Sequence, residues 1–405
     1  MLSEEKPCIM KKTNPKWRWS GGQYFLTAAT LILLTFGCQS GGGESSSNPV
    51  SGEKDHFPHK VEVSHSIGFD VSYHQNYKLL HIFRHYNDQA DTLTYTLLQR
   101  GTEDPGLENP VITVPVEKIV SLSTTHLGFF NLLDAFDELI GIETEQYVSS
   151  TKVKDMVAAG TVKEMSPSGP LNVESVINEG TEVVMAVGYP NSQNESFQQL
   201  ERVGIPVLLN ADWQELDLLG RAEWVKLLAV LLNKEQLVNE RFGEIEAEYE
   251  EVLSKVNDLS SANLSTITGI AIGDGWHVSG GRSFAAQLLK LVKADYPWMN
   301  EASTGSLKLD FETVYEQGLT ADVWMVPGSA KSMAEILERD SRYADFKSFK
   351  DGTIYNIFGR YTPGGGNDYY EQGVIEPHVI LKDIVKIFHP SLLPDHELVY
   401  HSQLK

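Results

Sequence analysis

The sequence predicts an α/β fold with two Rossmann-like lobes, each built on a mainly parallel sheet. A long rigid helix would join the lobes, and a small N-terminal β appendage would precede them. A cap, helix and strand pattern occurs twice, at residues 171–187 and 309–326, which favours a duplicated lobe over a chance likeness between two units. Short apolar runs also alternate with helical patterns throughout residues 116–388, as expected of parallel strands with crossover helices.

The first 37 residues have the features of a lipoprotein signal peptide. Cations at residues 11–18 precede an apolar run at residues 25–36, which is too short to cross a bilayer core of ~30 Å comfortably. Cys38 follows and is the expected lipidation site, and the alternative is an unmodified thiol in an ordinary secretory signal. The other cysteine, Cys8, lies in the segment to be removed, so no internal disulfide is expected. Met10 is an alternative start.

Charge and length narrow the function classes. The formal net charge is −22, and removal of residues 1–37, with five Lys/Arg and two Glu, leaves −25. Nucleic acid is therefore excluded as a partner, because phosphate binding needs a basic face. Residues 38–55 are rich in Gly and Ser and are expected to form a flexible tether. The remaining ~350 residues are enough for two lobes with separate cores.

The first half of the folded part is expected to contain an appendage and one lobe. Residues 56–113 alternate polar and apolar side chains, which predicts a small antiparallel β appendage. Its histidines have no compact metal-binding spacing, so no metal site is expected. Residues 114–217 form the N-terminal lobe. Its predicted strands are residues 119–122, 139–142, 182–187 and 206–209.

The second half begins with a helical region, residues 218–257, that breaks near Asn233. Its second part, residues 234–256, would be ~35 Å long at 1.5 Å per residue and is the expected rigid connector between the lobes. Residues 258–405 form the C-terminal lobe. Its predicted strands are residues 266–272, 323–326 and 353–357, and its last predicted helix is residues 377–388.

The two copies of the repeat carry matching cap residues. Asn172 and Asp310 can each accept hydrogen bonds from first-turn amides, and a Gly near each helix end frees the exit of the chain. Glu174 and Glu312 lie in the first turns of the two helices, where a negative charge contributes ~0.3–1 kcal/mol. Two such exposed carboxylates could also steer docking onto a cationic protein surface.

Ligands of open α/β sheets meet the loops after the carboxyl ends of strands, and these loops are rich in aromatic residues and Arg here. Such groups suit a bulky, partly planar ligand. The same residues have structural alternatives: Tyr189 and Trp213 as core aromatics, His126 as a capping or buried histidine, and the arginines as surface pairs. The candidates are Ser123, Thr124, His126, Tyr147, Tyr189 and Trp213 in the first lobe, and Trp276, Arg282, Arg360 and Tyr361 in the second.

Catalytic motifs are lacking in the glycine-rich segments. Residues 363–368 have neither the Lys-Ser/Thr of a phosphate loop nor dinucleotide spacing, which indicates a loop without a phosphate site. Residues 277–281 resemble a nucleophile elbow only superficially, because His277 replaces the first Gly. No metal-binding or acid-base cluster can be assembled from the sequence. We therefore do not expect an enzyme.

The chain resembles the class III solute-binding lipoproteins of ABC transporters for ferric siderophores, haem and cobalamin, over residues 114–387. Residues 119–126 look like the opening strand and loop of that family, and residues 216–224 and 367–394 resemble a Bacteroidetes-type subgroup. In the family one Glu of each lobe pairs with permease arginines, and the matching positions are Glu174 and Glu312. The β appendage departs from the compact members.

The resemblance implies capture without chemistry. A ligand that is already an iron or cobalt chelate would bind between the lobes without a cofactor or a protein-metal bond, and the loaded protein would dock on an ABC permease of the inner membrane. The protein would be lipid-anchored in the periplasm. Haem would need an axial ligand, and Tyr189, Tyr361 and His277 are the candidates. The few basic groups favour a neutral ferric hydroxamate or a corrinoid. A chelatase-like enzyme and a scaffold lipoprotein are the alternatives.

Overall fold

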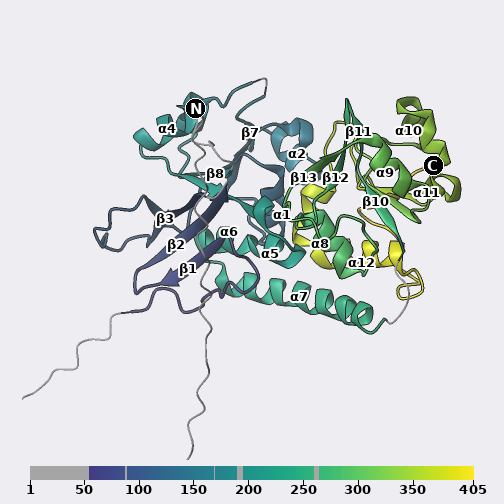
Figure 1. Cartoon of the computed structure of the whole chain (residues 1–405). Coiled ribbons are helices and arrows are strands. Elements are labelled where there is room, and N and C mark those ends of the chain that lie inside the picture. The colour runs from purple at the N-terminus through teal and green to yellow at the C-terminus, as the bar shows by residue number, and fades with distance from the viewer. Residues whose placement is uncertain (1–53, 87–88, 168, 189–194, 260–263) are drawn as a thin grey trace, which may run out of the picture. The chain divides into compact units, whose positions relative to one another are not determined.

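The computed structural model describes residues 54–405, apart from residues 87–88, 168, 189–194 and 260–263. Residues 53–405 form one compact unit (Figure 1). The signal peptide, Cys38, almost all of the tether and Tyr189 lie outside the described residues. No described helix is both long enough and apolar enough to span a membrane.

A four-stranded sheet opens the described part. Its order is β1-β2-β3-β4, with β1 and β2, and β2 and β3, antiparallel as expected, but β3 and β4 parallel. Apolar side chains of this sheet, including Leu80 and Leu97, lie in the same buried cluster as Phe129 of the first lobe. The predicted appendage is therefore present and shares a core with the lobe. The strands are β1 (Phe69–Tyr73), β2 (Tyr77–Tyr86), β3 (Gln89–Gln99) and β4 (Val111–Val114).

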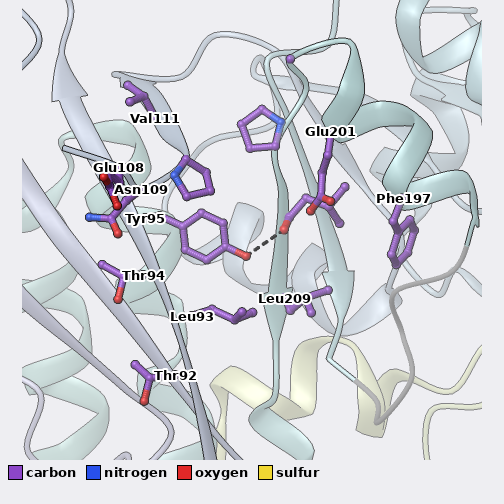
Figure 2. A pocket seen from close by; sticks show the side chains of 14 residues that line it. Thr92, Leu93, Thr94, Tyr95, Glu108, Asn109, Val111, Phe197, Glu201 and Leu209 are labelled. Atoms are coloured by element: carbon purple, nitrogen blue, oxygen red, sulfur yellow. Dashed lines mark hydrogen bonds between the residues drawn. The ribbon is translucent and has the colours of Figure 1, made fainter. Parts of the chain in front are cut away.

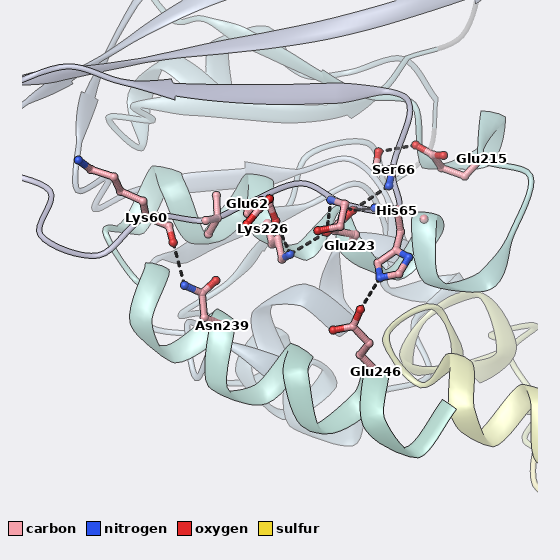
Figure 3. A network of polar contacts seen from close by, with 12 residues as sticks. Lys60, Glu62, His65, Ser66, Glu215, Glu223, Lys226, Asn239 and Glu246 are labelled. Atoms are coloured by element: carbon pink, nitrogen blue, oxygen red, sulfur yellow. Dashed lines mark hydrogen bonds and ion pairs between the residues drawn. The ribbon is translucent and has the colours of Figure 1, made fainter. Parts of the chain in front are cut away.

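Two buried carboxylates bind residues 64–68, the segment before β1, through hydrogen bonds (Figure 3). Glu223 accepts backbone N–H groups of Ser64, His65 and Ser66 at 2.7–2.9 Å. Glu215 accepts the Ser66 hydroxyl at 2.5 Å and the Gly68 N–H at 3.1 Å. Because both carboxylates are 2% exposed or less, losing these partners would leave buried acceptor oxygens short of hydrogen bonds. The segment therefore fixes the first sheet to the first lobe.

The first lobe is built on a five-stranded sheet with the order β7-β6-β5-β8-β9, and every neighbouring pair is parallel. The predicted strands are confirmed, some with ends shifted by a residue. The strands are β5 (Ile119–Ser121), β6 (Leu139–Ile142), β7 (Lys163–Glu164), β8 (Val183–Val187) and β9 (Val207–Asn210). The helices are α1 (Thr124–Leu132), α2 (Thr151–Ala158), α3 (Val173–Asn178) and α4 (Glu195–Arg202).

Three helices follow: α5 (Leu218–Glu223), α6 (Val225–Leu232) and α7 (Glu235–Asn257). The predicted break is confirmed, since Asn233 adopts a left-handed backbone with φ of 55°, a conformation that Asn tolerates better than most residues. The 23 residues of α7 span ~35 Å. This helix packs against α6 of the first half and α12 of the second (Figure 1), as expected of a connector.

The second lobe contains two sheets instead of one. In the first, β10 (Thr266–Thr268), β14 (Val323–Met325) and β15 (Ile354–Asn356) are parallel, and β16 (Ser402–Gln403) joins antiparallel. The second is antiparallel and was not expected: β11 (Ile270–Ile272), β12 (Gly275–Ser279) and β13 (Ser306–Leu309). The helices are α8 (Phe284–Leu291), α9 (Phe311–Gly318), α10 (Met333–Arg339), α11 (Lys347–Asp351) and α12 (Pro377–Phe388).

The core of the second lobe is aromatic, and it contains Trp276. This side chain is fully buried and its ring centroid lies 5.5–6.0 Å from those of Trp324, Tyr343 and Phe346. Its Nε1–H donates to the Thr268 carbonyl at 3.0 Å. The prediction that Trp276 contacts a ligand is therefore wrong. It stands on β12 and faces the core because its polar edge has an internal partner.

Candidate functional site

A segment of the second half, residues 367–376, crosses to the first lobe. The Glu371 carboxylate accepts the backbone N–H groups of Ser149 and Ser150 at 2.6 and 2.8 Å, just before the start of α2. On α1, a Cβ atom at Gly128 would lie 2.5 Å from the Glu371 carbonyl oxygen, so only glycine permits this approach. This bridging segment, together with α7, links the two lobes, and it contributes to two cavities.

The larger of these cavities, which we call the polar cavity, has a volume of about 610 Å³, within the usual range of ligand pockets. Both lobes line it. The first lobe contributes residues around the start of α2 and along α1, and the second contributes the loop after β15 and the bridging segment. Its lining comprises Leu127, Asn131, Phe136, residues 149–152, residues 359–362, Asp368, Glu371, Gln372 and Glu376.

The smaller cavity, which we call the aromatic cavity, has a volume of about 260 Å³. It lies at the carboxyl ends of β10, β14 and β15, the edge at which open α/β sheets bind ligands. Tyr369 and Tyr370 of the bridging segment face it, and their rings meet edge to face with centroids 5.2 Å apart. Tyr370 keeps 45% of its surface exposed. This tyrosine therefore has free surface for a ligand.

Arg221 on α5 brings a positive charge to the aromatic cavity. Its Nε donates to the Asp212 carboxylate at 2.9 Å, and its guanidinium lies 5.6 Å from the ring centre of Phe284 on α8. Burial opposes the charged form, but the charge and hydrogen bond of Asp212 outweigh burial and raise the pKa of Arg221 above its ordinary value. The guanidinium is therefore permanently charged and already paired.

The cations of the polar cavity are likewise engaged. Arg360 donates to Asp368 at 3.3 Å, and the Lys152 ammonium lies 4.4 Å from the ring centre of Phe136. Three carboxylates, Asp368, Glu371 and Glu376, line the same space. The two cavities together thus offer no surplus of positive charge. An anionic ligand with several negative charges would find no free pair of cations here.

Glu371 is the most perturbed carboxylate of the site. Burial raises its pKa to about 7, against the lowering effect of the Ser149 and Ser150 N–H groups, and the charge of Asp368 raises it further. Its protonation state therefore changes near neutral pH. Because its oxygens accept hydrogen bonds from the first lobe, this titration affects a contact between the two lobes.

Two of the predicted ligand residues, one from each lobe, come together. A Cβ atom at Gly365 would lie 3.6 Å from Cδ1 of Tyr147 and 3.8 Å from the Tyr361 hydroxyl. Tyr147 is 53% exposed, and Arg360 and Tyr361 line the polar cavity. The glycine-rich loop that follows Tyr361 is a hydrogen-bonded turn, with the Thr362 N–H donating to the Gly366 carbonyl at 2.8 Å.

The remaining first-lobe candidates occupy the strand ends as expected. The Ser123 hydroxyl accepts the Thr125 N–H at 3.3 Å and caps α1, of which Thr124 is the first residue. Trp213 follows β9 in a short 3-10 turn, is 37% exposed and neighbours Asp212. These three residues lie at the correct edge of the sheet but line neither of the two cavities.

The structure corrects the prediction that His126 contacts a ligand. Its side chain is fully buried, its Nδ1 is 3.0 Å from the Ser121 hydroxyl, and burial lowers its pKa to about 4. It is thus a neutral core histidine and not a ligand contact, because α1 turns it inwards beside β5.

In the second lobe, Arg282 is exposed in the turn before α8 and lines neither cavity, and His277 is exposed on β12.

Sequence reasoning missed Arg221, Tyr370 and Glu371. The predicted ligand residues all follow predicted strands, whereas these three stand on α5 and on the bridging segment. A signal was present, since Arg221 belongs to residues 216–224 and the tyrosines to residues 367–394, both of which had supported the family resemblance. Among the residues that the structure describes, no group of three His, Cys, Asp or Glu side chains could hold a metal ion.

The two repeat glutamates lie on the surface of equivalent helices. Glu174 is exposed on α3 and has no charged partner among the described residues. Glu312 is exposed on α9, and the Arg342 Nη1 lies 4.0 Å from its carboxylate. Arg342 itself is held by Asp340, with Nη2 and Oδ2 2.6 Å apart. Both glutamates are exposed, and within the described part of the chain only Glu312 has a cation nearby.

Comparisons with known proteins agree with this architecture. The family described as "Periplasmic binding protein" matches residues 119–361. A periplasmic binding protein from Veillonella parvula superposes with a TM-score of 0.52 at 12% identity, covering 77% of this chain and 98% of that chain. The periplasmic haem-binding protein HutB of Vibrio cholerae gives a TM-score of 0.50 at 15% identity, covering 65% and 97%.

Relatives by sequence include two uncharacterised lipoproteins of Methanocaldococcus jannaschii. One is 25% identical over 289 residues, covering 69% of this chain and 67% of that protein. The other is 25% identical over 362 residues, covering 85% and 90%. The longer match extends well beyond the residues that the family description covers.

Proposed function

This chain belongs to the periplasmic binding protein family, and from that premise we propose that it is the substrate-binding component of an ABC importer. It is a binding protein and not an enzyme, which removes the chelatase-like alternative. The ligand would bind in the cleft formed by the polar and aromatic cavities, where tyrosines from both lobes meet. Closure would be small, because α7 and the bridging segment both link the lobes.

The proposed ligand is a metal chelate that enters with its iron or cobalt already wrapped. One observation carries the choice among chelates: both cleft arginines are already paired with carboxylates, Arg221 with Asp212 and Arg360 with Asp368. A triply anionic catecholate would need unpaired cations. A neutral ferric hydroxamate or a corrinoid needs mainly aromatic surface, which Tyr147, Tyr361 and Tyr370 supply.

Haem is the second candidate, favoured by one specific observation. Tyr361 lines the polar cavity and its phenol is a suitable axial ligand type. His277, the other described candidate for this role, lines neither cavity. Replacing Tyr361 with Phe would remove the axial oxygen while keeping the ring. Haem bound through this residue would then lose its phenolate absorption, and a hydroxamate would bind unchanged.

Delivery would use the two surface glutamates and a lipid anchor. We propose that Glu174 and Glu312 pair with cations of a permease, one per lobe, and that Cys38 is lipidated so that the protein stays at the membrane on the periplasmic side. The two lipoprotein relatives support the anchor. The two glutamates stand in the first turns of α3 and α9, so they would present equivalent charges from the two lobes.

The test of capture is a fluorescence titration of the chain from residue 39 onward. Intrinsic tryptophan emission would be followed against a ferric hydroxamate, a ferric catecholate, haem and cobalamin. We expect saturable quenching at submicromolar concentration by the hydroxamate or cobalamin. Quenching by the catecholate alone would contradict the charge argument, and no response to any of the four would contradict capture of a chelate.

The test of docking is uptake by cells that carry Glu174→Ala together with Glu312→Ala. Chelate affinity of the purified variant should match the wild type, while uptake is abolished. Glu244→Ala with Glu250→Ala is the matched control, because these exposed glutamates lie on α7 and not on α3 or α9, the helices that carry the proposed contacts. Normal uptake in the first variant would refute the docking role.

A further inference from the structure

A separate cavity lies between the N-terminal sheet and the open edge of the first lobe's sheet, away from the interlobe cleft. Its volume is about 640 Å³, well inside the range of small-molecule sites. β3 and the loop before β4 form one wall, and α4 and β9 form the other (Figure 2). No residue of this cavity lines the polar or the aromatic cavity. It therefore exists only because this chain carries the extra sheet.

Tyr95 determines the character of this space. Its hydroxyl donates to the Val207 carbonyl at 2.9 Å, which satisfies a backbone group on the free side of edge strand β9. Figure 2 shows the ring reaching from the β3 wall towards the β9 wall. Because the hydroxyl is already engaged, what the residue offers to a ligand is its ring. Leu93, Phe197 and Leu209 extend the apolar surface around it.

Every charged residue that lines the cavity is an acid. Glu108 comes from the loop before β4 and Glu201 from α4, so the carboxylates belong to opposite walls. Both are exposed, and neither has a cation partner among the residues that the structure describes. Arg84, the cation whose charge reaches Tyr95, is itself paired with Asp91. The cavity therefore combines an aromatic and aliphatic floor with an unneutralised negative rim.

We propose that this cavity is a second ligand-binding site, for an organic cation that carries an ammonium or guanidinium group on an apolar body. The apolar body would lie against Leu93, Phe197 and the Tyr95 ring, and the cation would lie between Glu108 and Glu201. A neutral ligand of equal size would lose the attraction of both carboxylates. This site does not depend on the proposed transport function.

The experiment compares three probes that share a phenylbutyl body and differ in the end group: 4-phenylbutylamine, 4-phenylbutanol and 5-phenylvalerate. Each would be titrated into the chain from residue 39 onward and followed by saturation-transfer difference NMR. We expect the amine to bind at least tenfold more tightly than the alcohol and the carboxylate not to bind. Equal binding of amine and alcohol, or no amine binding up to ~10 mM, would overturn the proposal.

Variants locate the bound amine. Glu201→Gln should weaken amine binding about fivefold or more, and Thr92→Trp, which places a large ring at the cavity wall, should abolish it. Glu195→Gln is the matched control, because Glu195 also lies on α4 but does not line the cavity. A thermal melt of each variant checks folding. Unchanged amine binding in both Glu201→Gln and Thr92→Trp would place the amine elsewhere and contradict the proposed site.

Discussion

The two lobes repeat one cap, helix and strand unit, yet the two copies pack against different kinds of side chain. In the first lobe, Val120 and Val184 belong to a cluster that is aliphatic apart from Phe197. In the second, Trp276, Trp324, Tyr343 and Phe346 form an aromatic cluster in which all six pairs of ring centroids are 5.3–6.0 Å apart. The repeat therefore preserves the course of the backbone but not the packing that stabilises it.

The two glycines of the repeat, Gly180 and Gly318, are also required for different reasons. Gly180 has φ of +70°, so it is needed for the left-handed turn that ends α3. Gly318 has no positive φ, and a Cβ atom there would lie 2.5 Å from the Phe346 ring. The first glycine serves the backbone and the second serves the aromatic core. A residue at equivalent positions of a repeat can thus be required for unrelated physical reasons.

The largest effect is predicted for a substitution that disrupts the aromatic core. Trp276→Ala should lower the free energy of unfolding by about 3–5 kcal/mol, because it removes a fully buried ring and leaves a cavity. The aliphatic counterpart Val184→Ala should cost about 2 kcal/mol. Urea unfolding of the purified proteins measures both. A Trp276→Ala protein of normal stability that fails to bind chelate would contradict the core role and return Trp276 to the ligand site.

The second effect concerns the contact between the lobes. Glu371 has a folded pKa of about 7 against an ordinary value of 4.5, so its contribution to stability is complete below pH ~4.5 and is lost as pH rises through 7. Glu371→Gln cannot ionise. The stability of this variant relative to wild type should therefore rise by about 3 kcal/mol between pH 4.5 and 7.5.

Urea unfolding at a series of pH values provides this comparison. Glu371→Gln loses one of its two backbone acceptors, since an amide has a single oxygen, so only the pH dependence of the difference is diagnostic. Glu376→Gln is the control, because it lines the same cavity without accepting from Ser149 or Ser150. A flat difference between Glu371→Gln and wild type would show that Glu371 does not titrate in this range.

The smallest effect compares the two caps. Asn172 accepts the Ser175 N–H at 3.0 Å, and Asp310 accepts both the Thr313 N–H and the Thr313 hydroxyl at 2.8 Å. Asn172→Ala and Asp310→Ala should each cost about 1 kcal/mol, and Asp310→Ala should cost more, because a charge at the helix start is lost as well. Thermal unfolding ranks them. Equal costs would mean that the second hydrogen bond and the charge contribute nothing.

Much of the fold could be predicted because it depends on local signals. The ends of β6 and α12, and the break at Asn233, match the predictions to the residue. The antiparallel sheet β11-β12-β13 could not be predicted, because residues 266–272 read as one strand. Gly269 divides them, with φ of +72° and the His277 carbonyl 1.9 Å from where a Cβ atom would lie.

The candidate site was predicted less completely. Tyr147 follows β6, and Arg360 and Tyr361 follow β15, as predicted, but only the latter two line the polar cavity and Tyr147 lines neither cavity. Trp276 was misjudged because its neighbouring glycines indicated a loop. Gly280 and Gly281 instead allow close approach of the backbone at residues 299–305. Arg221, Tyr370 and Glu371 depend on how α5 and the bridging segment pack, which the pattern of strand ends does not encode.

The central claim is that the ligand contacts the interlobe cleft and not the aromatic core of the second lobe. Isothermal titration of the best-binding chelate into Tyr370→Ala and Trp276→Phe tests it most directly, since Tyr370 is exposed in the cleft and Trp276 is buried. We predict at least a tenfold loss of affinity for Tyr370→Ala and wild-type affinity for Trp276→Phe. Wild-type affinity in Tyr370→Ala with a loss in Trp276→Phe would contradict the claim.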